Sequence, residues 1–276
     1  METELTKKMK IAVTTTRQCD VSLMNKAQSV SEELDIPYIK RENIGINQIL
    51  ENTNIEYLLV VEKDKITLKG KDSILFWHPN MSELKIKSIN KGNKEALIES
   101  TQLKDGDSVL DCTLGLAGDS LVFSFVVGEN GKVVGTEVNK FIAYLCKNGL
   151  SSYKNHKGET PQYMKNIKVI NVSYEEYLTT QSNDSFDVVY FDPMFKKPNK
   201  KSSSINALRN FANHNSITKK TLLEALRVCK KRVVIKERQG ENDFETLGIK
   251  TYYGSEKSGS IIYGIIEKKD MNQFED

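Results

Sequence analysis

The stretch DSVLDCTLGLAGDS, residues 107–120, is typical of a strand, a turn and a helix that follow one another directly. Its apolar residues predict a buried strand over Ser108–Cys112, and the apolar run that follows the turn predicts a helix over 119–128. Gly115 and Gly118 let the turn adopt positive φ or approach a ligand closely. The stretch therefore predicts a ligand-binding loop at the start of a helix.

Three further strand patterns follow, and each ends in polar residues. The second strand, 132–136, ends in Glu137, which is placed to bind both hydroxyls of a ribose. The third, 167–170, leads to the segment 171–174, which is suited to line an adenine, and the fourth leads to Asp192. This βαβαβαβ order predicts an α/β sheet that binds a nucleotide-like cofactor at the carboxyl ends of its strands.

The charges around the first turn indicate which cofactor binds. A dinucleotide site requires G-x-G-x-x-G, whereas this loop has only Gly115 and Gly118 and is bracketed by Asp111 and Asp119. Two carboxylates would repel a pyrophosphate, but they suit the sulfonium and ammonium groups of S-adenosylmethionine, which has no phosphate. The sequence therefore predicts S-adenosylmethionine.

The turn after the fourth strand, Asp192-Pro193-Met194-Phe195, suits the methylation of an exocyclic amino group on a flat base. Asp192 and the carbonyl of Pro193 offer acceptors to the amine, and Phe195 offers an aromatic face to the base. A D-P-x-F tetrapeptide alone is common in proteins. It indicates an amino-group methyltransferase here because the cofactor-binding pattern precedes it in the sequence. We expect Asp192, Pro193 and Phe195 to be the catalytic residues.

These motifs make the chain resemble class I S-adenosylmethionine-dependent methyltransferases. More closely, it resembles the bacterial small-subunit rRNA guanine-N2 methyltransferases (the RsmJ type) and their uncharacterised Gram-positive relatives. The resemblance covers roughly residues 75–268, and it departs from the family pattern where Lys196 replaces a proline and Gly118 an arginine. It implies a Rossmann-like, seven-stranded mixed sheet and methyl transfer to N2 of a guanine in small-subunit rRNA.

The resemblance also implies roles for the polar residues at the strand ends. Asp192 would lie between cofactor and substrate amine, and Asp111 and Gly115 would shape the floor of the site. Gly118 and Asp119 would contact the methionine end of the cofactor, and Glu137 its ribose. The adenine would be contacted by Val138, Ser173 and Tyr174.

Two alternatives stay open at this point. An N6-adenine methyltransferase acting on RNA or DNA needs the same geometry around the amine. A non-catalytic RNA-binding protein on a decayed methyltransferase fold is a second alternative, although the intact acids Asp111, Glu137 and Asp192 argue against decay.

Lysines beside the Asp-Pro turn predict contacts with an RNA backbone. The four nearest, and the ones that we expect to bind nucleic acid, are Lys196, Lys197, Lys200 and Lys201. Two further basic clusters are Lys85, Lys87, Lys91 and Lys94, and Arg227, Lys230, Lys231 and Arg232. The expected partner is ribosomal RNA or the small ribosomal subunit.

The composition is that of an ordinary globular protein. The 276 residues are 38% hydrophobic and 28% charged, with a formal net charge of +3. Four scattered cysteines and three unclustered histidines predict buried thiols and no metal site. Neither a membrane-spanning run nor a signal segment is evident, so we expect a cytoplasmic protein.

The chain is expected to form two domains and a tail. Residues 1–80 predict a small N-terminal α/β subdomain, which includes a short strand over 36–40. Residues 81–268 predict the methyltransferase domain, and 269–276 a charged, disordered tail.

Overall fold

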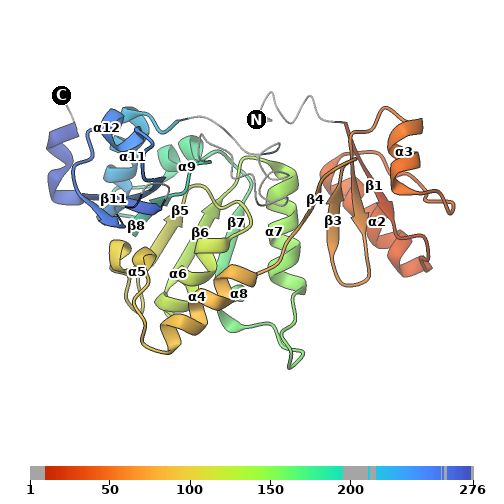
Figure 1. The fold of residues 1–276 in the computed structure, drawn as a ribbon, viewed down its shortest axis with the longest axis horizontal. Helices are drawn as coiled ribbons and strands as arrows, with labels where there is room; N and C mark the ends of the chain where they lie inside the picture. The colour runs from red at the N-terminus through yellow and green to blue at the C-terminus, as the bar shows by residue number, and fades with distance from the viewer. Residues whose placement is uncertain (1–9, 195–210, 212–215, 256, 258–259, 275–276) are drawn as a thin grey trace. The chain divides into compact units, whose positions relative to one another are not determined.

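The structure, a computed structural model, describes residues 10–194, 211, 216–255, 257 and 260–274 (Figure 1). The chain divides into two compact units. The first comprises 1–78, 139–160 and 198–212, and the second 79–138, 161–197 and 213–276.

The second unit contains a seven-stranded sheet within its described residues, in the order β10-β11-β9-β8-β5-β6-β7. The five strands from β9 to β7 are parallel, and the β10–β11 hairpin adds to β9 in antiparallel fashion. The predicted mixed sheet is confirmed. Its strands are β5 (Ser108–Asp111), β6 (Lys132–Thr136), β7 (Ile167–Ile170), β8 (Phe186–Phe191), β9 (Cys229–Arg238), β10 (Tyr252–Gly254) and β11 (Ile261–Glu267).

Helices of the second unit pack on this sheet in two groups. In the first group, α6 packs on β5, β6 and β7, and α4 and α8 pack against α6. In the second group, α11 packs on β8 and β9, and α9 and the 3-10 helix η1 pack against α11. α6 is apolar nearly throughout because most of its residues are buried. The helices are α4 (Asn80–Asn90), α5 (Ala96–Thr101), α6 (Gly118–Val127), α8 (Gln162–Lys165), α9 (Tyr174–Thr180), α11 (Lys219–Val228), α12 (Asp243–Leu247) and η1 (Lys268–Phe274).

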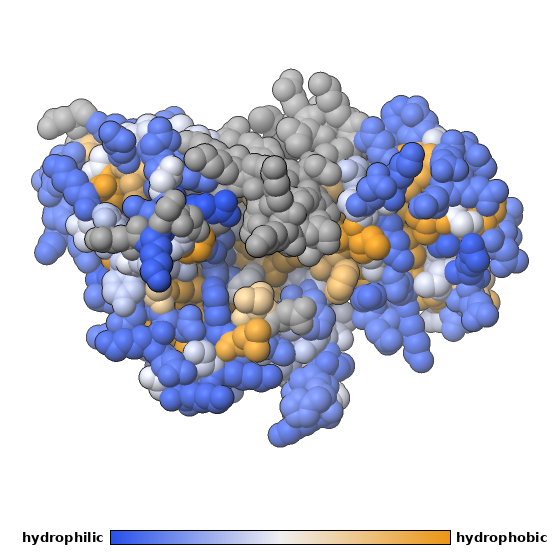
Figure 2. All heavy atoms as spheres, in the orientation of Figure 1, coloured by the Kyte–Doolittle hydropathy of each residue, from blue (hydrophilic) through white to orange (hydrophobic). Residues whose placement is uncertain are grey.

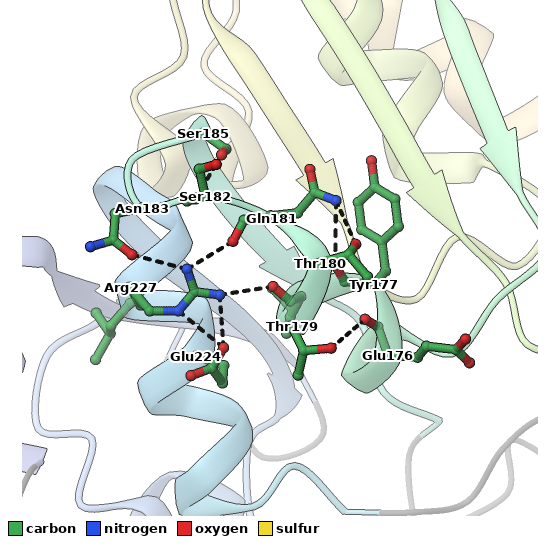
Figure 3. A network of polar contacts seen from close by, with 12 residues as sticks. Glu176, Tyr177, Thr179, Thr180, Gln181, Ser182, Asn183, Ser185, Glu224 and Arg227 are labelled. Carbon is green, nitrogen blue, oxygen red and sulfur yellow. Dashed lines mark hydrogen bonds and ion pairs between the residues drawn. The ribbon is translucent and has the colours of Figure 1, made fainter.

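Arg227, in the last turn of α11, ties this helix to α9 and to the turn that follows it (Figure 3). Its guanidinium donates to the carbonyls of Leu178 and Gln181 at 2.9 and 2.8 Å, and it pairs with Glu224 at 2.8 Å. Planar guanidinium donors match such a spread of acceptors, and the carbonyls at the end of α9 gain partners. This contact fixes the end of α9 beside α11.

The first unit contains, among its described residues, a four-stranded sheet in the order β1-β2-β3-β4. β1 and β2 are parallel, and the following pairs are antiparallel. α7 belongs to this unit and contacts β3, and Gly149 of α7 lies against the Trp77 ring. The elements are β1 (Ile11–Thr15), α2 (Val21–Leu34), α3 (Ile46–Asn52), β2 (Tyr57–Val61), β3 (Ile66–Lys69), β4 (Ile74–Phe76) and α7 (Lys140–Ser152).

Three expectations differ from the structure. Residues 139–160, expected in the second domain, group with the first unit because α7 packs on β3 and Trp77. The strand expected over 36–40 is a single bridge between Val13 and Tyr38. The segment expected to be a disordered tail forms η1, since Phe274 packs into the core of the second unit.

The surface in view is mostly hydrophilic, with apolar side chains scattered among charged ones (Figure 2). Cys112, Cys146 and Cys229 are buried, as the sequence predicts. Within the part of the chain that the structure describes, no helix is long and apolar enough to cross a membrane.

Candidate active site

Three neighbouring parallel strands bring acidic and basic side chains to one edge of the sheet. β5 pairs with β8, where Asp111 lies opposite Tyr190, and β8 pairs with β9, where Phe191 lies opposite Ile235. The residues that follow this last pair, Asp192 and Lys236, therefore come at the same level at the carboxyl end of the sheet. This edge is where open α/β sheets bind ligands.

Lys236 joins two carboxylates at this edge. Its Nζ lies 2.8 Å from Asp119 Oδ2 and 2.7 Å from Asp192 Oδ2, and its side chain is only 14% exposed. Burial lowers the pKa of Lys236, but the two carboxylates outweigh burial and hold that pKa well above its ordinary value. Lys236 is therefore a fixed positive charge between two acids.

Asp119, in the first turn of α6, is surrounded by donors. Besides Lys236, Lys85 Nζ lies 2.9 Å from Oδ1, and the Tyr190 hydroxyl donates to Oδ2 at 2.7 Å. Burial raises the pKa of Asp119, yet the two ammonium groups and the hydrogen bonds outweigh it and bring the pKa well below its ordinary value. Asp119 is an ionised anchor for the residues around it.

Asp192 is the most open acid of the group, with 32% of its side chain exposed. Its backbone N–H donates to Thr113 Oγ1 at 2.5 Å, which ties the turn after β8 to the turn after β5. Burial raises the pKa of Asp192, Lys236 opposes that rise, and the Asp119 carboxylate adds to it. One oxygen, Oδ2, faces Lys236, while Oδ1 has no hydrogen-bond partner among the described residues.

Asp111 is only 2% exposed at the end of β5. It accepts hydrogen bonds from Ser120 Oγ at 2.6 Å and from the Thr113 N–H at 3.1 Å. Burial raises the pKa of Asp111 to about 7, because these two hydrogen bonds offset the loss of solvent only in part. Asp111 thus holds the turn against the start of α6.

The turn between β5 and α6 contains two residues with positive φ. Gly115 has φ 52°, Ala117 has φ 62°, and the Gly115 N–H donates to Glu137 Oε2 at 3.1 Å. No atom would meet a Cβ added at Gly115 within 4 Å. The turn therefore faces open space, with Glu137 fixed at its side.

The segments after β6 and β7 are joined by Asn171. Its side-chain amide donates to the carbonyls of Glu137 at 2.7 Å and of Val138 at 3.1 Å. Ser173 caps α9 by accepting from the Glu176 N–H at 3.1 Å. Asn171 thereby orients the backbone around Glu137, at the same sheet edge as the acids.

This chain matches, over residues 42–255, the model of a family described as "Putative SAM-dependent methyltransferase". The chain belongs to this methyltransferase family. It is 34% identical over 256 residues to the uncharacterized protein YpiP of Bacillus subtilis, covering 92% of this chain and 98% of that protein. It is 29% identical to the ribosomal RNA small subunit methyltransferase J of Francisella philomiragia, over 68% of this chain and 78% of that one.

Among solved structures, a SAM-dependent methyltransferase from Neisseria gonorrhoeae has the same fold. The TM-score is 0.60 at 16% identity, covering 93% of this chain and 96% of that one. The predicted class I methyltransferase fold is confirmed, and S-adenosylmethionine is the cofactor of the family.

The residues of this methyltransferase suit that cofactor. Carboxylates of Glu137 and Asp192 lie at the strand ends and complement a sulfonium and an ammonium. The open space above Gly115 leaves room for a ligand beside Glu137. The carboxylates do not suit a pyrophosphate, in agreement with the choice made from the sequence.

Three residues predicted to contact the cofactor have other partners in the structure. Tyr174 is buried in the core with its ring edge-on to Phe191, 5.5 Å between centroids, so its backbone is the part that lies at the sheet edge. The Gly118 carbonyl accepts from Ser82 Oγ at 2.6 Å, and Asp119 faces lysines. Contacts of Gly118, Asp119, Val138, Ser173 and Tyr174 with the cofactor stay predictions.

Several predicted substrate residues lie outside the described residues. These are Phe195, Lys196, Lys197, Lys200 and Lys201. Pro193 is half-buried directly after Asp192. The remaining basic clusters are partly occupied by structural contacts, because Lys85 pairs with Asp119, Lys231 with Asp107 and Arg232 with Glu267.

Sequence reasoning missed Lys236, Tyr190 and Thr113 as parts of the site. Lys236 left one signal, a lysine that ends the apolar run Val233–Ile235 in a strand that is otherwise buried. This lysine points to the site only once the register between β8 and β9 is known, because that register places Lys236 level with Asp192. The sequence does not reveal the register of these two strands.

One acidic cluster lies at the end of β9 and in the residues that follow it. Carboxylates of Glu237, Glu241 and Asp243 come within 4.8 Å of one another. Glu237 accepts from the backbone N–H groups of Asp243 and Phe244 at 2.8 and 3.2 Å and so caps α12. The cap on α12 explains why a carboxylate is buried at position 237.

Proposed function

We propose that this methyltransferase acts on an exocyclic amino group, N2 of a guanine in small-subunit rRNA. The observation that carries the proposal is Asp192, whose Oδ2 is held by Lys236 while Oδ1 has no hydrogen-bond partner among the described residues. The rRNA substrate is supported by the relatives named ribosomal RNA small subunit methyltransferase J. The reaction would take place in the cytoplasm, where ribosomal subunits assemble.

Methyl transfer requires that the substrate amine is held in one orientation. Bound S-adenosylmethionine supplies a methyl group on a sulfonium. The amine lone pair is delocalised into the base, so Asp192 Oδ1 and the Pro193 carbonyl would accept its two N–H groups and direct the lone pair out of the ring plane. Catalysis of this kind is mainly positioning and electrostatic stabilisation.

Lys236 would keep Asp192 in its acceptor form. An ionised carboxylate accepts hydrogen bonds, whereas a protonated one also donates, and the neighbouring Asp119 favours protonation of Asp192. The ammonium of Lys236, 2.7 Å from Asp192 Oδ2, counteracts that tendency. We assign Lys236 as a positioning residue for Asp192.

RNA would reach this site as an unstacked nucleotide, because the amine of a paired guanine is not accessible. Phe195 is proposed to stack on the base for about 1–3 kcal/mol. The lysines that follow are proposed to contact the RNA backbone.

Mass spectrometry of rRNA nucleosides from a deletion strain and its parent tests the proposal. The expected result is loss of N2-methylguanosine at one position of the small-subunit rRNA, restored by the wild-type gene and not by Asp192→Ala. Loss of N6-methyladenosine would favour the alternative substrate. Unchanged nucleosides, together with no methyl transfer to small subunits in vitro, would contradict the rRNA assignment.

A further inference from the structure

The first unit carries a basic cluster at the carboxyl end of β1. Segment 37–39 extends the parallel part of this sheet, because the Val13 N–H donates to the Pro37 carbonyl at 2.8 Å and the Ile39 N–H to the Val13 carbonyl at 2.7 Å. The chain then reaches Arg41, while β1 itself leads to Arg17. Parallel neighbours thus deliver two arginines to the same edge.

Arg41 is a buried cation, only 8% exposed. Its Nε donates to the Ile44 carbonyl at 2.6 Å and its Nη1 to the Thr15 carbonyl at 3.0 Å. A guanidinium has five N–H donors, so these two contacts leave others for a ligand. Burial lowers the pKa of Arg41, and the positive charge of Arg17 lowers it further.

Arg17 lies beside the same segment as Arg41. A Cβ added at Gly45, the residue before α3, would be 3.5 Å from Arg17 Nη2, and Arg41 holds the adjacent Ile44.

No carboxylate pairs with either arginine among the described residues. The acids nearest in sequence have other partners: Asp20 caps α2 at 2.8 Å, Glu42 faces Lys40 at 3.7 Å, and Glu62 faces Thr67 and Lys69. Two neighbouring cations, one of them buried, are unfavourable unless an anion compensates them. The cluster is therefore built for an anion.

We propose that Arg17 and Arg41 form a phosphate-binding site in the first unit, and that its ligand is the backbone of the RNA substrate. The choice of RNA rests on the proposed function. Arginine forks match phosphate oxygens. Such contacts carry no sequence information, so the first unit would hold RNA for the methyltransferase unit irrespective of the bases bound.

The test compares two charge reversals in the full chain. Arg17→Glu alters the site at an exposed residue, so folding is preserved. Lys71→Glu is the matched control. Lys71 is exposed and follows β3, which runs antiparallel to β2, so it lies at the end of the sheet opposite to Arg17. Affinity for a short fluorescein-labelled single-stranded RNA of mixed sequence is measured by anisotropy over a range of salt concentrations.

Arg17→Glu should weaken RNA binding roughly tenfold or more and reduce the slope of log affinity against log salt by about 0.7 per lost phosphate contact. Lys71→Glu should change both much less, and S-adenosylmethionine affinity should be unchanged in both variants. Equal RNA affinity and slope in the two variants would overturn the site while leaving the proposed function intact. RNA binding absent from the wild type would overturn the site, whereas the proposed function is tested separately by methyl transfer to small ribosomal subunits.

Inorganic phosphate separates a free anion from an RNA backbone. If phosphate binds the wild type but not Arg17→Glu, and also competes with RNA, the backbone assignment stands. If phosphate binding depends on Arg17 but RNA affinity does not, the ligand is a free anion and the RNA assignment is wrong.

Discussion

Lys236 and Asp192 share a contact of 2.7 Å between Nζ and Oδ2, although 44 residues separate them in the chain. The same ammonium lies 2.8 Å from Asp119. One buried lysine therefore couples the start of α6, which is predicted to border the cofactor, to the turn after β8, which is proposed to hold the substrate amine. Substitution of Lys236 therefore tests the proposed link between these two parts of the site most directly.

Lys236→Met should raise the pKa of Asp192, because the Asp119 carboxylate then lies near it without the bridging charge. The acidic limb of the activity–pH profile should move to higher pH, since more alkaline solution is needed to ionise Asp192. Stability should fall by about 3 kcal/mol, as is usual when one partner of a buried pair is removed. Lys85→Met is the matched control: it removes a contact to Asp119 but none to Asp192, and because the charge of Lys85 lowers the pKa of Asp192 less than that of Lys236 does, the profile should move less. A profile unchanged in Lys236→Met would remove Lys236 from the mechanism.

Asp192→Ala should fold and bind S-adenosylmethionine with much of the wild-type affinity while losing most methyl transfer. The side chain is partly exposed, and its proposed partner is the substrate amine. Calorimetry and single-turnover methylation on small ribosomal subunits measure the two effects separately. Near-normal turnover of the folded, cofactor-saturated variant would exclude Asp192 from the reaction.

Glu137→Ala should weaken S-adenosylmethionine binding roughly tenfold or more, since a hydrogen bond to a charged group contributes about 1.5–3 kcal/mol. The variant also loses the acceptor for the Gly115 N–H, so the turn after β5 is less ordered. Glu129→Ala, an exposed residue of the same unit, is the control in calorimetry. Wild-type protein should not bind NAD. Equal affinities in the two variants would contradict the assignment of Glu137.

Asp111 should make stability depend on pH. Its pKa rises from 3.8 to about 7 in the folded protein, so between these values the folded state binds more protons than the unfolded state. The free energy of unfolding therefore falls as pH rises through this window, by about 4 kcal/mol. Asp111→Asn lacks this term, so its stability relative to wild type should be higher at pH 8 than at pH 4. Urea denaturation without cofactor checks this; a constant difference would show that Asp111 has an ordinary pKa.

Replacing Lys196, Lys197, Lys200 and Lys201 together with alanine should weaken RNA binding across sequences and flatten its salt dependence. Lysine contacts to phosphate release counterions whatever the base sequence. Cofactor affinity should be unchanged, because none of these lysines is among the residues that are predicted to contact the cofactor. Retention of the parent's RNA affinity and salt slope would show that the run is an ordinary solvated surface.

Local patterns account for the elements that were predicted well. The runs 132–136 and 167–170 became β6 and β7 with the same bounds, because apolar spacing acts within a few residues. Asp111 and Asp192 were found as candidates for the same reason, since each directly follows or ends a buried strand. The wrong expectation for the tail shows the limit, because only packing against the core orders Phe274.

The sequence by itself determined the α/β class, the S-adenosylmethionine cofactor and the strand-end acids, because these depend on residue type and short-range order. Only the tertiary structure decided how the acids are compensated. Strand register places Lys236 beside Asp192, and helix packing brings Lys85 to Asp119 across 34 residues. The same holds for Arg17 and Arg41, which meet because segment 37–39 pairs with β1. Charge pairing depends on distances in space, and chain order leaves those distances undetermined until the sheet has formed.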